Sequence, residues 1–559
     1  MSTQTKLRPI TLEAMENEEP RGILAEKRLF FLAVIGSLLL MAQFARKFLD
    51  FSKYPFEDAA MLMRYAQHLA QTGAIVWNSG ASPVDGGTDF LFMLVLAAMV
   101  KVGLSVEIAA RLTGIVSHVL TVILVYVTIT RLHKGSRWLA LLSATYLAIG
   151  PALPLISAYF GTPFFALFAS LTWYFANKLV EEKNSAINSL FFALSGLLMG
   201  LIRPEGVLLA TFMLFAVTYM KGIKQSRGVI VTFFATFMLI GGLYFLWRWN
   251  YFGYPLPNPF YKKGGGHIYL SSLQESLRAV LRLCGPFLLA FILGLRSKKT
   301  LRPTIFLLIP TLGFSCVWIL LSGEMNFEGR FQYAILPIVL MSWPTLVRGL
   351  YRDLKLPRLK ALDKRNQVVL LATISCICLG TLLYQGSVDS QDTYFHDGRY
   401  DVAKMLSSYS SKNYTMATTE AGLLPLYSKW RDIDTWGLND AWIAHHGQIT
   451  ADYLDAYKPE LIMFHASFSP FVSVEYRGNS EEWFKTWFPM VMTLKQYAER
   501  HRYILAADFG VSPYDTFYYY VRPAFADSAE IVQKIRHIDY YSSTTGEICI
   551  NYALFHPVQ

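Results

Sequence analysis

The sequence is poor in charged residues and in cysteine, and both shortages limit what the protein can be. Only 16% of its 559 residues are charged while 53% are hydrophobic, a balance that indicates a membrane protein and not a soluble or disordered one. Four of the five cysteines lie in or beside apolar runs, so no disulfide framework or zinc spacing is present. Cys376 and Cys378 are therefore interpreted as packing residues and not as a redox pair.

Several signatures of known chemistry are also missing. The chain has no glycine-rich phosphate loop, no HExxH motif and no Ser-His-Asp order, so an ATPase, a metalloprotease or a serine hydrolase has no support. Asp434, His445 and His446 lack the spacing of metal ligands, and no metal-binding residue is predicted. The first apolar stretch starts only at residue 29 and has no small-residue cleavage site, which predicts an uncleaved membrane helix.

Long apolar runs, by contrast, are abundant. A helix needs about 20 apolar residues to cross the hydrocarbon core, and backbone groups in lipid must find their partners within the segment. The runs therefore predict a mostly α-helical, polytopic membrane protein with about 11 transmembrane helices. The predicted spans are 29–45, 109–130, 138–156, 162–178, 188–202, 206–220, 228–247, 281–295, 303–321, 331–347 and 367–385.

The net charge of +11 reflects short basic clusters between these runs, a pattern of membrane orientation and not of nucleic-acid binding. The clusters occupy alternate connections and contain 24 of the 51 Lys and Arg residues. The apolar run Phe90–Val100 would invert this alternation if it crossed the membrane, so we place 89–104 on, or dipping into, the outer face. The predicted cytoplasmic segments are 1–28, 131–137, 178–187, 221–227, 296–302 and 348–366.

The other connections then face outward, together with everything after residue 385. The chain divides into a cytoplasmic tail (1–28), a transmembrane domain (29–385) with a large first outer loop (46–108), and a soluble periplasmic α/β domain (386–559). The shorter outer connections are 157–161, 203–205, 248–280 and 322–330. The predicted strands of the α/β domain are 415–419, 459–464, 503–507 and 516–521, and its predicted helices are 401–409, 481–500 and 528–538.

The carboxylate pair Glu57-Asp58 follows the first predicted span. A fixed carboxylate at the bilayer surface can accept the proton of an attacking hydroxyl, and burial would raise the pKa of one member of the pair. Arg64 is a candidate cation for keeping the other member charged. The alternative is that Glu57 or Asp58 merely favours the N-terminus of the following helix.

Basic and aromatic side chains recur at the other outer connections. Arg203, next to Pro204 and Glu205, either binds a lipid phosphate or extends its side chain to the headgroups. Arg248 and the rigid segment 256–263 suit a phosphate on an apolar chain, although aromatic residues are also common at membrane interfaces. The cluster 323–331 carries Glu324, Glu328 and Arg330, charges that are costly near lipid without a function or a partner.

Taken together, these segments resemble the GT-C class of integral-membrane glycosyltransferases. The resemblance is greatest to the branch that contains the mycobacterial terminal arabinofuranosyltransferase, and it runs in order across most of the chain. The segments that carry it are EDAAMLMRYA (57–66), GAIVWN (73–78), VDGGTDFLF (84–92), RPEG (203–206), LPNPFY (256–261), GEMNFEGRF (323–331), ATTEAG (417–422) and IDTWGLND (433–440).

The resemblance implies an inverting transfer of sugar from a polyprenyl-monophosphate-sugar to an envelope glycan or glycolipid, on the outer face of a bacterial cytoplasmic membrane. Asp58 would be the general base, with Glu57 beside it, and Glu205, Glu324, Glu420 and Asn439 would contact substrate. A divalent cation, Mg²⁺ or Mn²⁺, stays open, because no spacing requires one. The predicted donor- and phosphate-binding residues are Arg64, Arg203, Arg248, Asn258, Tyr261, Lys262 and Arg330.

The chain departs from this family at three points, and two other functional classes stay open. Glu57 replaces the family's first aspartate, Tyr159-Phe160-Gly161-Thr162 lacks a carboxylate often found there, and Ser322–Asn326 replaces a Gly-Gly-Asp-Trp-Met sequence. A transporter or flippase of lipid-linked saccharides would instead carry charges inside its spans. A sensor or scaffold would need no carboxylate pair after the first helix.

Overall fold

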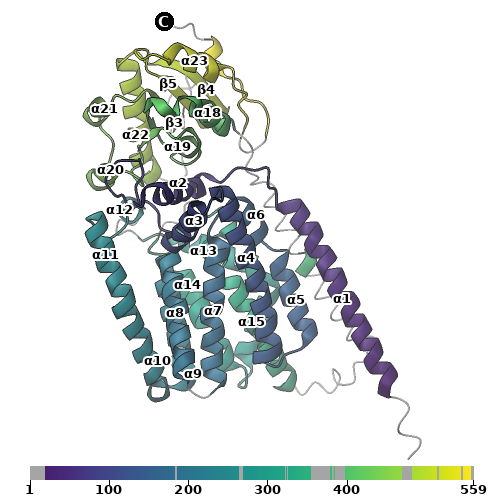
Figure 1. The fold of residues 1–559 in the computed structure, drawn as a ribbon. Coiled ribbons are helices and arrows are strands. Elements are labelled where there is room, and N and C mark those ends of the chain that lie inside the picture. Colours follow the sequence, from purple (N-terminus) through teal and green to yellow (C-terminus); the bar gives the residue numbers. More distant parts are fainter. Residues whose placement is uncertain are drawn as a thin grey trace, which may run out of the picture.

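The computed structural model describes residues 19–182, 185–263, 268–321, 323, 325–353, 378–380, 383, 397–466, 468, 481–512, 515–542 and 546–555. The fold is mostly helical and has two parts, a bundle of long helices and a smaller domain that contains the sheet (Figure 1). Shorter helices lie between the two parts. These short helices position the site described below.

The long helices coincide with the apolar runs of the sequence, because backbone groups in such runs pair only within the segment. Helix α1 (Glu19–Phe48) lies at one edge of the bundle and α10–α11 at the opposite edge (Figure 1). The others are α4 (Val106–Val127), α5 (Arg137–Ala148), α7 (Thr162–Glu181), α8 (Ala186–Ile202), α9 (Glu205–Lys221), α10 (Ile223–Thr236), α11 (Gly242–Phe252), α13 (Leu270–Arg296), α14 (Leu301–Val317) and α15 (Ile335–Asp353).

Five described segments are long and apolar enough to cross a membrane, and each contains one of the predicted spans. The predicted spans that form α7, α8, α9, α14 and α15 are helices of 17 to 20 residues. The predicted span 367–385 lies outside the described residues except for 378–380 and 383, which are helical. The five long segments are Glu26–Phe48, Val106–Leu132, Arg137–Ser157, Ile223–Phe252 and Leu270–Arg296.

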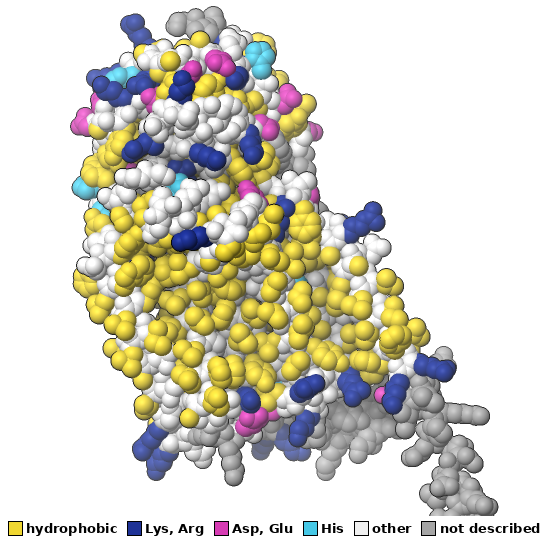
Figure 2. Space-filling view, in the orientation of Figure 1, with side chains coloured by type: hydrophobic (Ala, Val, Ile, Leu, Met, Phe, Trp, Pro, Cys, Tyr) yellow, Lys and Arg dark blue, Asp and Glu magenta, His cyan; other side chains and the backbone are white. Residues whose placement is uncertain are grey.

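Figure 2 shows a broad hydrophobic belt across one face of the bundle, with Lys and Arg gathered below it and mixed charges on the domain above it. Inside the bundle, buried indole N–H groups bond to serines of neighbouring helices. Trp173 donates to Ser342 at 2.8 Å, and Trp343 donates to Ser143 at 2.9 Å. Such bonds satisfy polar groups where water is absent and hold the helices in register.

Short helices form a layer over one end of the bundle: α2 (Glu57–Thr72), α3 (Phe90–Lys101), α6 (Ala152–Ser157) and α12 (Asn258–Lys263). With 12 residues, α3 extends about 18 Å, too little to cross about 30 Å of hydrocarbon. This length agrees with the interpretation of 89–104 as a surface helix. The 3₁₀ turn Phe327–Gly329 precedes α15 at the same end.

The C-terminal domain has an α/β fold around a five-stranded sheet of order β2-β1-β3-β5-β4. Strands β2, β1 and β3 are parallel, and β5 is antiparallel to both β3 and β4. The strands are β1 (Thr415–Thr418), β2 (Arg431–Asp434), β3 (Leu461–Ala466), β4 (Ile504–Ser512) and β5 (Asp515–Val521). The helices are α18 (Arg399–Leu406), α19 (Leu423–Ser428), α20 (Ala441–His446), α21 (Ala451–Tyr457), α22 (Glu481–Arg500) and α23 (Ser528–Arg536).

Candidate active site

A cavity of about 460 Å³ lies where the short helices cover the end of the bundle. Segments from all of the predicted outer connections before residue 331, and one residue of the C-terminal domain, line it. These segments therefore lie at one end of the bundle, as the sequence predicts. The lining residues are Asp58, Ala59, Met61, Leu62, Gly86, Gly87, Thr88, Asp89, Tyr159, Phe160, Gly161, Arg203, Pro204, Glu205, Leu208, Leu256, Pro257, Pro259, Phe260, Trp318, Leu321, Arg330, Phe331 and Leu438.

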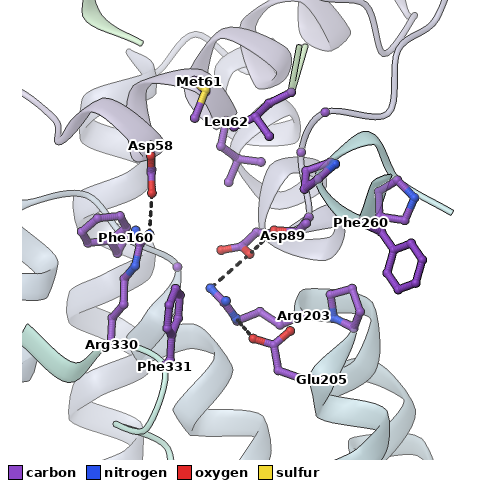
Figure 3. Close-up of a pocket in the computed structure, with 18 of the residues that line it drawn as sticks. Asp58, Met61, Leu62, Asp89, Phe160, Arg203, Glu205, Phe260, Arg330 and Phe331 are labelled. Atoms are coloured by element: carbon purple, nitrogen blue, oxygen red, sulfur yellow. Dashed lines mark hydrogen bonds and ion pairs between the residues drawn. The ribbon is translucent and has the colours of Figure 1, made fainter. Parts of the chain in front are cut away.

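Asp58 enters the cavity from the first turn of α2 (Figure 3). The preceding Phe56 is extended at the helix N-cap and packs its ring against those of Phe160 and Phe327. This aromatic contact fixes the point at which α2 begins. The carboxylate of Asp58 accepts a hydrogen bond from Nη2 of the buried Arg330, and the two form an ion pair.

A second group of charges comes from the junction of α8 and α9. Arg203 has an extended backbone, and Pro204 starts α9. The Nε of Arg203 donates to Glu205 at 2.6 Å, and its Nη1 lies 3.6 Å from Asp89 (Figure 3). Burial raises the pKa of Asp89, and the guanidinium of Arg203 opposes this only in part.

The ring of Phe331 is shared by both guanidinium groups. The Cζ of Arg203 lies 5.1 Å from its centroid and the Cζ of Arg330 lies 5.0 Å from it. Arg330 also lies over Phe160 at 4.2 Å, and Phe331 stacks on Trp318 at 4.5 Å. Cation–π contacts of this kind favour a fixed position for each cation. The cavity lining thus contains two guanidinium groups, Arg203 and Arg330, and three carboxylates, Asp58, Asp89 and Glu205.

Two of the predicted site residues face the C-terminal domain and not the cavity. Glu57 accepts hydrogen bonds from the backbone N–H groups of Gly422 and Leu423, at 2.7 and 3.0 Å. Arg64 is buried and donates to the carbonyl oxygens of Trp77, Pro425 and Trp430. Arg64 also donates to Oδ1 of Asn78 at 2.9 Å, so its guanidinium joins two parts of the fold.

The four predicted residues of α11 and α12 also lie outside the cavity lining. Arg248 forms an ion pair with Asp85, and the side chain of Asn258 is buried. The ring of Tyr261 lies 4.5 Å from that of His445. The Nζ of Lys262 donates to the carbonyl of Gly447 at 2.7 Å. Arg248, Tyr261 and Lys262 therefore contact neighbouring segments of the protein. Other residues of the same region line the cavity, namely Leu256, Pro257, Pro259 and Phe260.

The predicted substrate residues are divided in the same way. Glu205 lines the cavity, whereas Glu420 binds Arg399 at 2.8 Å within the C-terminal domain. The Nδ2 of Asn439 donates to Asp434 and lies 3.1 Å from Sδ of Met61, so it contacts the rim of the site and not its centre. Glu324 lies outside the described residues.

Asp89 and Phe331 belong to the cavity although neither was predicted as a site residue. Asp89 directly precedes the apolar helix α3, where a carboxylate in the sequence is typical of a helix cap. Its side chain makes no capping hydrogen bond and lies in the cavity instead. The position of Asp89 inside the motif VDGGTDFLF is the one signal in the sequence that could have identified it.

No group of three or more His, Cys, Asp or Glu side chains is arranged to hold a metal ion within the described part of the chain. The three cavity carboxylates instead have arginine partners. The mechanism proposed below assigns no role to a divalent cation.

Comparisons with known proteins identify the fold. A family model described as a domain of unknown function (DUF8728) matches residues 391–521, and no curated protein matches the chain. ArnT from Cupriavidus metallidurans in the apo state is similar over 89% of this chain and 99% of its own, with a TM-score of 0.55 and 12% identity. AglB, an archaeal oligosaccharyltransferase from Archaeoglobus fulgidus in complex with an inhibitory peptide and a dolichol-phosphate, is similar over 88% of this chain and 74% of its own, with a TM-score of 0.50 and 12% identity. The chain therefore shares its fold with ArnT and AglB.

Proposed function

We propose that the protein is a glycosyltransferase that takes its sugar from a polyprenyl-monophosphate-sugar and transfers it to an envelope glycan or glycolipid. The observation that carries this proposal is the pair Arg203 and Arg330, held on one phenyl ring beside carboxylates in a cavity at the end of an apolar bundle. Two guanidinium groups at a membrane boundary suit the phosphate of a lipid-linked donor, which an uncharged site would not hold.

Arg330 has unused capacity for such an anion. Its Nε is buried and has no hydrogen-bond partner among the described residues. A buried donor of this kind is unfavourable until a ligand supplies an acceptor. The phosphate of the donor would bond to Arg330 and Arg203, and the planar guanidinium allows two parallel hydrogen bonds to one phosphate.

Asp58 is the proposed general base. The acceptor hydroxyl attacks the anomeric carbon, its proton passes to the Asp58 carboxylate, and the bond from that carbon to the phosphate oxygen breaks. The polyprenyl phosphate leaves with the bonding electrons, and Arg203 and Arg330 balance its charge. When the phosphate binds Arg330, the ion pair with Asp58 weakens and the carboxylate becomes a stronger base. A displacement in line inverts the anomeric configuration.

An apolar wall faces these charges and would hold the first isoprene units of the donor. Leu208 and Phe260 line the cavity and are 42% and 44% exposed, so the wall continues onto the outer surface of the protein. AglB, which shares the fold, has been solved with a dolichol-phosphate, and its ligand has the same chemistry, a phosphate on a polyisoprenoid chain. This shared chemistry supports a lipid-linked donor.

The proposed location is the cytoplasmic membrane of a bacterium, with the cavity and the C-terminal domain on the periplasmic side. The hydrophobic belt and the basic residues beneath it support this orientation (Figure 2). Arabinose and mannose are both candidates for the transferred sugar, and the resemblance to the arabinofuranosyltransferase-like branch favours testing arabinose first.

The test is transfer of label from polyprenyl-phosphate sugars by the purified protein in membranes of defined lipid composition. We expect radiolabel to move from the donor to an added glycan or glycolipid acceptor, with release of polyprenyl phosphate. Movement of intact donor across the bilayer without cleavage would instead show a flippase. Binding of the donor without either event would show a sensor or scaffold.

A further inference from the structure

The first turn of α2 makes contacts on two sides, and the adjacent residues Glu57 and Asp58 make them. Asp58 faces the cavity, while Glu57 faces the C-terminal domain and is buried against it. One oxygen of Glu57 accepts hydrogen bonds from the N–H groups of Gly422 and Leu423. The other lies 3.4 Å from Nη1 of Arg399. The residue beside the proposed base therefore joins α2 to a domain about 365 residues later in the chain.

The same face of α2 makes further contacts with the C-terminal domain. Met61 lies four residues after Glu57 and contacts Asn439, and Arg64 lies three residues after Met61. Such spacing places the three side chains on one face of a helix. Because Arg64 also bonds to Trp77, the C-terminal domain holds α2 and the loop that follows it as one unit.

The contact at Gly422 leaves no room for a side chain. A Cβ atom at this position would lie 2.2 Å from the backbone oxygen of Glu57 and 2.8 Å from its carbonyl carbon. The backbone φ of Gly422 is −103°, which other residues adopt easily. Glycine is therefore required here for close approach to α2, and not for a positive φ.

A buried charge cluster surrounds this contact. Arg399 lies 2.6 Å from Asp397 and 2.8 Å from Glu420, so three carboxylates share one guanidinium when Glu57 is included. Burial raises the pKa of Glu57. Buried ion pairs contribute little net stability and a precise geometry, so this cluster fixes orientation more than it holds the domains together.

We propose that the C-terminal domain sets the position of the Asp58 carboxylate by holding the first turn of α2 through Glu57 and Gly422. Glu57 is then a positioning residue. The rate effects that follow rest on the proposed transferase function, whereas the effects on α2 do not. Displacement of a reacting group by about 1 Å can reduce a rate on the order of 100-fold, so a small shift of α2 is sufficient to impair transfer.

The test compares Gly422→Ala with Gly228→Ala in the full-length protein. Gly228 is the matched control, because a Cβ there has open space and its φ is not positive. We expect Gly422→Ala to speed amide hydrogen exchange in residues 57–66 and to lower kcat about 10-fold or more. The Kd for polyprenyl monophosphate should change less than about 3-fold, since Arg203 and Arg330 belong to the membrane domain.

Each outcome decides the proposal. The proposal is overturned if Gly422→Ala changes neither the amide hydrogen exchange of residues 57–66 nor kcat. It is also overturned if the affinity for polyprenyl monophosphate falls by the same factor as kcat. Glu57→Gln provides a second variant if Gly422→Ala does not fold. Its amide oxygen can still accept from Gly422 and Leu423, while the contact with Arg399 loses its charge, so we expect a smaller change of the same kind. An inactive wild type would reject the proposed function, and the exchange measurement would still test the positioning.

Discussion

The carboxylate of Asp58 is paired with the guanidinium of Arg330, although 272 residues separate them in the chain. Asp58 opens α2 in the first outer loop, and Arg330 follows the 3₁₀ turn that leads into α15. Their contact therefore joins an early and a late segment of the membrane domain's sequence at one cavity. It also pairs the proposed base with a guanidinium for which the phosphate of a donor would compete.

Asp58→Asn should reduce sugar transfer about 100-fold or more, because an amide cannot accept the proton of the acceptor hydroxyl. The measurement is the initial rate with labelled donor at matched protein levels. Asp50→Asn is the control, since the Asp50 carboxylate accepts hydrogen bonds from the nearby Ser52 and lies outside the cavity lining. Transfer by Asp58→Asn at the rate of the control would remove Asp58 from the mechanism.

Arg203→Lys and Arg330→Lys should each raise KM for the donor about 10-fold, because lysine keeps the charge and loses bidentate contact with phosphate. Donor titrations at saturating acceptor measure this effect. Arg431→Lys, at an exposed position of β2, should leave KM unchanged. Equal KM values in all three variants would show that neither cavity arginine binds the phosphate.

Asp89→Asn should change the pH dependence of transfer. Burial raises the pKa of Asp89, and the ion pair with Arg203 requires the ionised carboxylate. The pair is lost as the pH falls through the raised pKa. We expect the wild-type rate to decline over this range, and the variant to lack this decline while its neutral rate is reduced about 10-fold. The same acidic decline in the variant would assign it to another group.

Asp508→Asn should stabilise the C-terminal domain, and more so at high pH. Asp508 is fully buried and neither carboxylate oxygen has a hydrogen-bond partner among the described residues. Burial raises its pKa from 3.8 to about 7. Because the folded pKa is higher than the unfolded one, stability is lost as the pH rises toward and through the folded pKa.

The measurement for Asp508→Asn is the thermal unfolding midpoint of the full-length protein. The gain over wild type should be larger at about pH 8.5 than at about pH 5.5, since the carboxylate must ionise without a partner only at the higher pH. Asp452→Asn changes an exposed carboxylate and should have little effect at either pH. An equal gain at both values would mean that the charge of Asp508 is not the cause.

Much of the fold follows from local sequence patterns. Where the predicted elements differ from the observed ones, the reason is also local. The predicted strand 459–464 became β3 and the predicted helix 481–500 is α22, because apolar and amphipathic runs of that length have few alternatives. Strand β2 was missed, since Arg431-Asp432-Ile433-Asp434 is too charged to indicate a buried strand. Helix α13 begins at Leu270, eleven residues before the predicted span, because its first turns are polar and lie outside the apolar run.

The site was harder to predict than the fold. Neighbouring residues on a helix point about 100° apart, so the sequence placed Glu57 and Asp58 together and could not say which one faces the cavity. The rotation of α2 decides this, and contacts with Gly422 and Arg330 set that rotation. The sequence also could not show that Arg64 and Lys262 donate to backbone carbonyls of the C-terminal domain, because those partners are far away in the chain.

The sequence by itself determined a mostly helical bundle with a C-terminal α/β domain, because hydropathy patterns act locally along the chain. It also showed that the candidate site residues before residue 331 lie in or beside the connections between the apolar runs. Only the tertiary structure decided that Asp58, Asp89, Arg203, Glu205 and Arg330 share one cavity and that Glu57 does not. That choice depends on packing between segments far apart in the chain, which no local pattern encodes.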